Sequence, residues 1–109
     1  MKLWIDDVRP APEGYVWCKS VNSTIGVIES VEQTFFNWYD VRDEDIISII
    51  DIDHDAGDYA SDGGDYIRLL DWFEETGRNY PIRIHSMNPV GVANMRAIIE
   101  RNGWKEVKR

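Results

Sequence analysis

One segment limits the possible folds more than any other in this chain. Residues 46–52 read Ile-Ile-Ser-Ile-Ile-Asp-Ile, a nearly continuous run of β-branched residues. A strand with one exposed face alternates apolar and polar residues, whereas a central strand of a parallel sheet is apolar almost throughout because both of its faces are covered. The run therefore predicts a central parallel strand and an α/β fold around it.

Shorter strands are predicted on both sides of this run. Apolar stretches bounded by prolines, glycines or acids predict three strands, at residues 3–5, 15–18 and 82–84. A further short edge strand is predicted at residues 104–109. Helical patterns separate most of these segments, so the strands are expected to be parallel and joined by right-handed crossovers.

The helices are predicted from apolar residues at helical spacing and from their caps. Each of three such patterns follows an N-cap candidate, namely Ser20, Asp62 and Asn88. Gly77 and Gly103 are placed to end the second and third helices. We therefore expect one domain over residues 1–109: a small doubly wound sheet flanked by helices, with the flavodoxin-like strand order 2-1-3-4-5, truncated at the fifth strand and helix.

Charge and cysteine content exclude several classes of protein. The chain of 109 residues has 20 acidic and 12 basic residues and a formal net charge of -8, the wrong sign for bulk nucleic-acid or anionic-membrane binding. The single cysteine, Cys18, allows neither an internal disulfide nor a zinc finger and fits a cytoplasmic location. The aromatic segment at residues 35–39 fits neither period and is a candidate surface for an unknown protein partner.

Acidic residues follow two of the predicted strands directly. Asp6 and Asp7 close the strand at 3–5, and Asp53 closes the central run. The carboxyl ends of parallel strands meet at one edge of a sheet, so these carboxylates are expected to converge. Close carboxylates repel unless a cation neutralises them, and the set suits Mg²⁺ or Mn²⁺ better than Zn²⁺. The alternative is that Asp6 and Asp7 only end a strand and cap a turn.

Both histidines of the chain follow predicted strands at the same edge. A pair of imidazoles, His54 and His85, can supply the acid and the base that cleavage of a phosphodiester needs, with Asp53 or Asp55 fixing the tautomer of His54. A single histidine near a strand end is more often structural, so the argument depends on the pair.

Three features at this edge favour binding of an anion. Amide groups of the helix that opens at Asn88 point toward the edge, and Ser86 lies between the strand and that helix. Arg9 is a candidate for a bidentate phosphate contact, or else a solvated loop cation. We therefore expect a small phosphorylated substrate, and the residues predicted to bind it are Arg9, Asp55, Ser86 and Asn88.

The segments that carry these residues resemble receiver domains of response regulators. In those domains an acidic pair, a phospho-acceptor aspartate and a serine or threonine follow strands one, three and four, and those positions hold Asp6, Asp7, Asp53 and Ser86 here. Receivers also keep a lysine at the end of a fifth strand, whereas only Lys105 and Lys108 follow the last predicted helix.

A divergent receiver-like family is more similar. Three motifs in this order resemble the cyclic-phosphate processing receiver domain: Trp-Ile-Asp-Asp-Val-Arg-Pro at 4–10, Asp-His-Asp at 53–55 and His-Ser-Met-Asn-Pro at 85–89. The resemblance implies a phosphoesterase that acts on cyclic phosphate groups, with the two histidines as its distinctive addition.

Three functional hypotheses follow. The leading one is a metal-assisted phosphoesterase that opens a cyclic phosphate of a nucleotide or an RNA end, with His54 and His85 as acid and base and Mg²⁺ on the three aspartates. The second is a signalling receiver that accepts a phosphoryl group on Asp53. The third is a non-catalytic module that binds a nucleotide or a metal.

Overall fold

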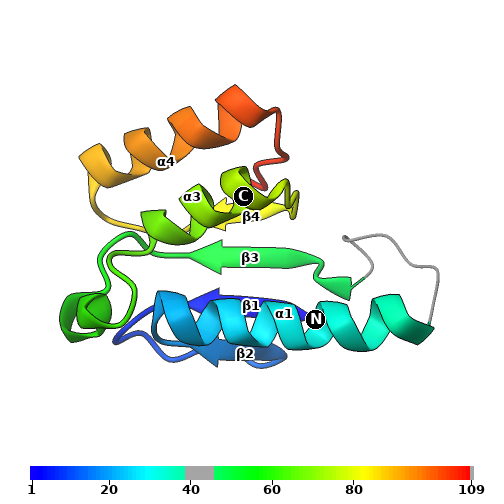
Figure 1. Cartoon of the computed structure of the whole chain (residues 1–109). Helices are drawn as coiled ribbons and strands as arrows, with labels where there is room; N and C mark the ends of the chain where they lie inside the picture. Colours follow the sequence, from blue (N-terminus) through cyan, green and yellow to red (C-terminus); the bar gives the residue numbers. More distant parts are fainter. Residues whose placement is uncertain (39–45, 109) are drawn as a thin grey trace.

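The computed structural model describes residues 1–38 and 46–108, which form four strands, three α-helices and one 3₁₀ helix (Figure 1). In chain order the elements are β1 (Lys2–Ile5), β2 (Tyr15–Cys18), α1 (Val21–Trp38), β3 (Ile49–Ile52), η1 (Gly57–Ser61), α3 (Ile67–Thr76), β4 (Ile82–Ile84) and α4 (Pro89–Asn102). None of the helices in these residues is long and apolar enough to cross a membrane.

The strands form one parallel sheet in the order β2-β1-β3-β4. Within the described part of the chain this is the flavodoxin-like order without a fifth strand, so the α/β receiver-like fold is confirmed. Ile5 pairs with Ile52, and Ile52 pairs with Ile84, and each is the last residue of its strand. The residues that directly follow the three strands are therefore side by side at one edge of the sheet.

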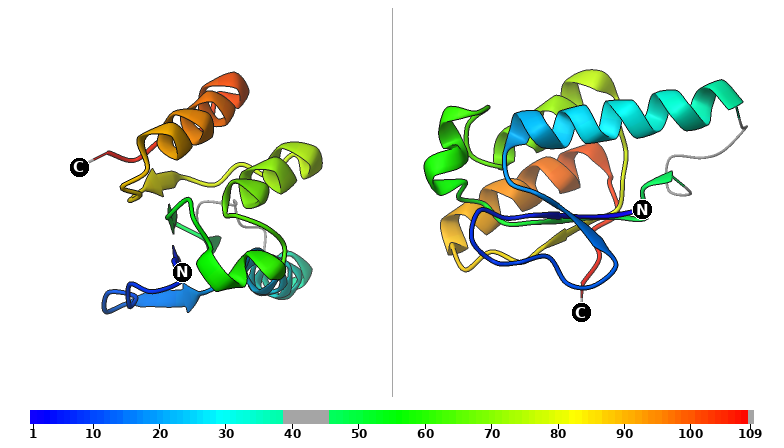
Figure 2. Two further views of the ribbon diagram at one scale, coloured as in Figure 1. Left: turned by 90° about the vertical axis from the view of Figure 1, so that its left-hand side faces the viewer. Right: turned by 90° about the horizontal axis from the view of Figure 1, so that it is seen from below.

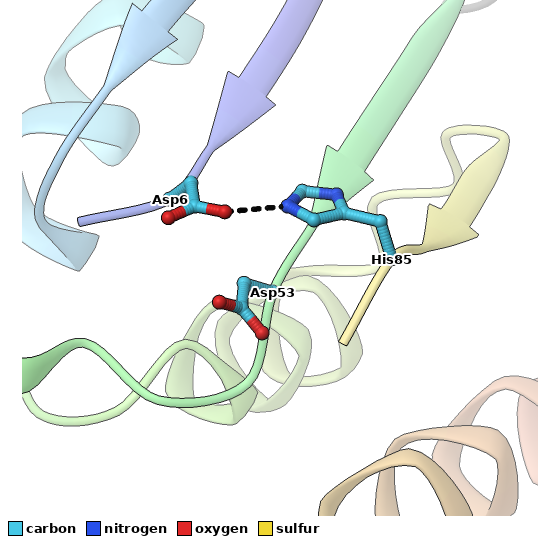
Figure 3. Close-up of side chains that lie close together, drawn as sticks. All are labelled: Asp6, Asp53 and His85. Atoms are coloured by element: carbon cyan, nitrogen blue, oxygen red, sulfur yellow. Dashed lines mark hydrogen bonds and ion pairs between the residues drawn. The ribbon is translucent and has the colours of Figure 1, made fainter. Parts of the chain in front are cut away.

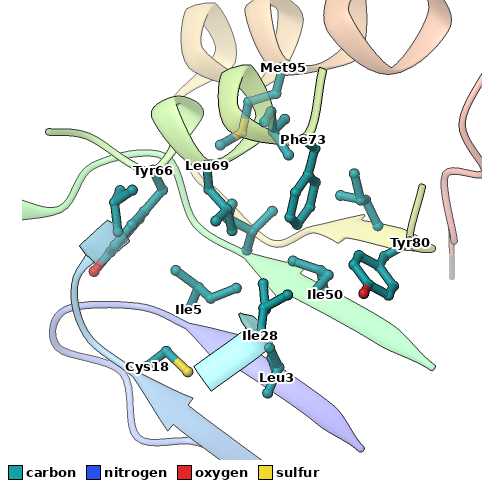
Figure 4. Packing of buried hydrophobic residues seen from close by; sticks show 14 of the residues in the cluster. Leu3, Ile5, Cys18, Ile28, Ile50, Tyr66, Leu69, Phe73, Tyr80 and Met95 are labelled. Carbon is teal, nitrogen blue, oxygen red and sulfur yellow. The ribbon is translucent and has the colours of Figure 1, made fainter. Parts of the chain in front are cut away.

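The apolar core lies between the sheet and the helices. Leu3, Ile5, Ile50 and Ile52 alternate along β1 and β3 and pack against α1 and α3, where Ile28 is fully buried (Figure 4). α4 adds Met95, Ile98 and Ile99 to the same cluster. In the end-on view α1 and α3 lie on one side of the sheet, and α4 packs beside α3 at the β4 edge (Figure 2).

The other face of the sheet carries polar and aromatic side chains in place of a helical layer. Trp4, Asp51 and Arg83 are neighbours in the register and point to the face opposite the apolar core. No α-helix of the described residues covers them, in contrast to the expected cover on both faces. Asp51 is nevertheless fully buried, because side chains of this face close over it.

Two of the predicted helix caps are confirmed and one is wrong. The Ser20 hydroxyl accepts a hydrogen bond from the Ser23 amide, and the Asn88 side chain accepts one from the Gly91 amide. Asp62 does not cap α3, which begins five residues later. Its carboxylate accepts hydrogen bonds from the Ser20 hydroxyl and the Asn22 amide group, so it ties the loop after η1 to the start of α1.

The predicted C-cap glycines are confirmed, whereas two strands are shorter than predicted. Gly77 and Gly103 both adopt left-handed conformations at helix ends, as predicted. The strand predicted at residues 46–52 covers only Ile49–Ile52. Of the strand predicted at 104–109, the described residues 104–108 form one parallel bridge, between Ile82 and Glu106.

The aromatic segment at residues 35–39 lies only partly within the described residues. α1 extends to Trp38, and the Phe35 side chain on it is 39% exposed. The remainder of the segment's side chains lie outside the described part of the chain, so its role as a docking surface stays a prediction.

Candidate functional site

Three side chains from three strand ends converge at the carboxyl edge of the sheet. Asp6, Asp53 and His85 each place one potential ligand atom within 4.8 Å of the other two (Figure 3). They follow β1, β3 and β4 directly. Backbone hydrogen bonds continue the pairing past the strand ends, since the amide of Asp53 donates to Ile5 O and the amide of His85 donates to Ile52 O. The register of the sheet therefore builds this group.

Asp6 uses its two oxygens for different tasks. Oδ1 accepts hydrogen bonds from the amides of Val8 and Arg9, both at 3.0 Å, which caps the turn after β1. Oδ2 lies 2.9 Å from Nε2 of His85. Burial disfavours the charged form of Asp6, but the two amides and His85 outweigh burial and lower its pKa. Asp6 thus stays ionised, and the same carboxylate both caps the turn after β1 and contacts His85 in the site.

His85 is held on three sides. Its Nδ1 lies 2.7 Å from Oδ1 of Asp51, its Nε2 contacts Asp6, and its ring stacks on Trp4 with centroids 3.9 Å apart and planes within 5°. Asp51 also accepts a 2.9 Å hydrogen bond from Arg83 Nη1. Both ring nitrogens of His85 therefore face carboxylates, which is the arrangement of an imidazolium donor or of a metal ligand oriented by a second carboxylate.

Asp7 lies next to this group but is not one of the three converging residues. Its Oδ2 is packed so closely on Gly57 that a Cβ added there would lie 2.4 Å from it. Burial raises the pKa of Asp7, and the charges of Asp6 and Asp53 raise it further. Close carboxylates of this kind favour a cation nearby.

His54 has a different environment from His85. Its Nδ1 lies 2.9 Å from Oδ1 of Asp55, and the Asn88 side chain donates weakly to Asp55 at 3.4 Å. The ring rests on Gly91 in the first turn of α4, where a Cβ would lie 2.4 Å from its Cγ. Nε2 has no hydrogen-bond partner among the described residues. The structure thus orients the imidazole through Asp55, not through Asp53.

Two cavities adjoin these residues. One, of about 320 Å³, brings the predicted substrate contacts together with Asp53. Its lining includes Arg9, Asp53, Asp55, Ser86 and Asn88. The other, of about 430 Å³, is lined by His85 and shares Arg9 and Ser86 with the first. His54 lines neither cavity, so the two histidines do not face each other across either one.

Sequence reasoning missed Asp51 and Trp4. Asp51 is the one acid within the apolar run at 46–52, and an ionised side chain in a buried strand needs a partner. That mismatch was a usable signal for a polar network on the second face. The contact between Trp4 and His85 had no such signal, because it depends on stacking between β1 and the end of β4.

A parallel sheet of this order, with an acidic group after β1 and β3 at its carboxyl edge, defines a receiver-like domain. A comparison with protein families adds the particular group: the model of the cyclic-phosphate processing receiver domain matches residues 1–101, and the chain belongs to that family. No curated protein and no solved structure matches the chain.

Proposed function

We propose that this receiver-like domain is a phosphoesterase that hydrolyses a cyclic phosphodiester of a nucleotide or of an RNA end. The observation that carries the proposal is the convergence of Asp6, Asp53 and His85 beside a cavity that also holds Arg9 and Ser86. Family membership supports the cyclic phosphate as the substrate class. A cytoplasmic location remains part of the proposal.

We assign proton transfer to His54, which lines neither cavity itself but is hydrogen-bonded through Nδ1 to Asp55 in the lining of the smaller one. Hydrolysis joins the water oxygen to phosphorus and breaks one of the two ring P–O bonds. One proton leaves the attacking water, and the leaving sugar oxygen gains one. Nδ1 of His54 is oriented by Asp55, and Nε2 is without a partner among the described residues, so Nε2 can take the proton from water. Solvent supplies the proton that the leaving oxygen gains.

We assign His85 a different role from the acid or base first expected of it. Both of its ring nitrogens contact carboxylates, which leaves neither of them free for the substrate in this arrangement. Its contacts instead hold Asp6 beside Asp53. Arg9 and Ser86 line the cavity where the phosphate oxygens would lie, and a guanidinium can donate two parallel hydrogen bonds to them.

The same residues fit a divalent cation. Asp6 and Asp53 offer oxygen donors, His85 Nε2 offers a nitrogen, and Asp51 would orient the imidazole from behind. A donor set with one imidazole suits Mn²⁺ better than Mg²⁺, which favours oxygen ligands. When bound, such an ion would neutralise charge on the phosphate.

Turnover assays test the proposal. We would incubate the protein with cyclic nucleotides and with oligonucleotides that end in a cyclic phosphate, with and without Mg²⁺ or Mn²⁺, and follow products by phosphorus NMR. We expect ring opening, and we expect His54→Ala to lower kcat by roughly 10²- to 10⁴-fold. No turnover of any probe, together with covalent labelling of Asp53 by a small phosphodonor, would overturn the enzyme in favour of the signalling receiver.

Thermal melts test the cation separately. Mn²⁺ at 100 times its Kd is expected to stabilise the protein by about 2.7 kcal/mol. Asp53→Asn should abolish the shift in Tm, whereas the matched control Asp71→Asn, on the exposed side of α3, should keep it. An unchanged Tm of the wild type at millimolar Mn²⁺ would contradict the site.

A further inference from the structure

The larger of the two cavities is basic although the chain as a whole is acidic. It opens over the sheet face that carries Trp4 and Arg83, has a volume of about 430 Å³, and includes residues of α4 and of the C-terminal segment. Four of the 12 basic residues of the chain line it, against a single acid, Glu106. In a chain with a net charge of -8, this concentration of cations indicates an anionic ligand.

Within residues 1–38 and 46–108, the three arginines of this cavity keep hydrogen-bond donors that no protein group uses. Arg9 donates from Nη1 to His85 O, Arg83 from Nη1 to Asp51, and Arg96 from Nε to the carboxylate of Glu106. A guanidinium has five N–H donors, so each arginine spends one nitrogen and retains others. Lys108, which is exposed, adds an ammonium group to the same lining.

The basic cavity adjoins the smaller one that contains Asp53, because Arg9 and Ser86 line both. A ligand seated beside Asp53 therefore needs to reach only past Arg9 to enter the basic cavity. The smaller cavity alone already contains Arg9 as a partner for one phosphate. The additional cations, Arg83, Arg96 and Lys108, therefore exceed what a single cyclic phosphate requires.

We propose that the basic cavity binds a second phosphate group of the substrate. This inference rests on the proposed function, because it takes the cyclic phosphate to lie beside Asp53. The preferred substrates are then nucleoside cyclic phosphates that carry another phosphate, either as a 5′-monoester or as the phosphodiester of a longer chain. A nucleoside cyclic phosphate that lacks this second phosphate has no anion to place in the basic cavity.

Three probes distinguish these sources: adenosine 2′,3′-cyclic phosphate, the same compound with a 5′-phosphate, and a diadenosine nucleotide that ends in a 2′,3′-cyclic phosphate. We expect the second phosphate to raise kcat/KM roughly 10- to 100-fold, since hydrogen bonds to charged groups are strong. A gain for the 5′-phosphate alone identifies a monoester site, and a gain for the dinucleotide identifies a phosphodiester site.

Matched variants of basic residues test where the gain arises. Arg96→Gln and Lys108→Gln should reduce the ratio of kcat/KM between probes with and without the second phosphate toward one. Arg101→Gln is the control, because Arg101 is also on α4 but pairs with Glu74 outside the cavity. Arg96 also joins α4 to Glu106, so the Lys108 variant keeps the test valid if the Arg96 variant unfolds.

Calorimetry of the same probes in EDTA separates this inference from the proposed function. If no probe is turned over but the second phosphate still strengthens binding in a manner that needs Arg96 and Lys108, the proposed function fails and the basic site stands. If all probes show equal kcat/KM and equal affinity, or if the preference survives both substitutions, the basic site is overturned whether or not the protein is an enzyme.

Discussion

Gly91 offers a sharp test of how His54 is placed. A Cβ at residue 91 would lie 2.4 Å from Cγ and 2.6 Å from Cδ2 of the imidazole, so Gly91→Ala must displace the ring or the first turn of α4. Gly26, in the second turn of α1, is the matched control, since a Cβ there would meet nothing within 4 Å. Both substitutions exchange a helical glycine for alanine, and only one meets a side chain.

The two substitutions are expected to change the free energy of unfolding in opposite directions. Overpacking costs about 1–3 kcal/mol, and alanine returns up to about 1 kcal/mol of helix propensity, so Gly91→Ala should lose about 0–3 kcal/mol of unfolding free energy. Gly26→Ala should gain about 1 kcal/mol. The two variants then differ by at least about 1 kcal/mol, which is about 4–8 °C in Tm for a domain of this size. Displacement of the ring should also lower turnover roughly 10²-fold.

Thermal melts followed by circular dichroism measure the stability difference, and NMR of the imidazole reports on the ring itself. The His54 signals should shift in Gly91→Ala and stay unchanged in Gly26→Ala. If Gly91→Ala melts as high as Gly26→Ala and leaves the His54 signals where they are in the wild type, the imidazole does not pack on α4 and its proposed orientation is wrong.

Three further tests concern the charged side chains. Asp7→Asn should raise the Tm of the metal-free protein at pH 7, because folding raises the pKa of Asp7 and its ionisation therefore opposes folding. The difference in Tm between variant and wild type should shrink as the pH falls through that raised pKa, and a difference that does not change with pH would contradict this. Asp51→Asn should destabilise the protein by roughly 3 kcal/mol in urea titrations, because it removes a buried carboxylate from its partners. It should also weaken Mn²⁺ binding by about 10- to 100-fold, because Asp51 orients the imidazole of His85, and an unchanged Mn²⁺ affinity would mean that Asp51 does not support the site. Glu32→Ala should lower the free energy of unfolding by roughly 3 kcal/mol, since it leaves Arg78 without its buried carboxylate. Glu74→Ala breaks an exposed ion pair and should lower it by less than about 1 kcal/mol. Equal losses would mean that burial does not set the strength of these pairs.

Much of the fold could be predicted from the sequence because it depends on local patterns. The apolar runs place the four strands, and the helical spacing with Ser20 and Asn88 places α1 and α4. The acids at the strand ends follow from the same patterns, since parallel strands share one carboxyl edge. Asp62 was assigned wrongly because a capping residue is recognised only by type, and its actual partners at the start of α1 lie about 40 residues away.

The roles within the site were decided by contacts between distant residues. His85 is joined to Asp51, 34 residues away, and to Asp6, 79 residues away, and these bonds separate its chemistry from that of His54. The sequence by itself determined which residues reach the carboxyl edge. Only the tertiary structure decided which carboxylate each imidazole contacts and which sheet face lacks a helical layer, because register and side-chain packing between neighbouring strands are not encoded in any local period.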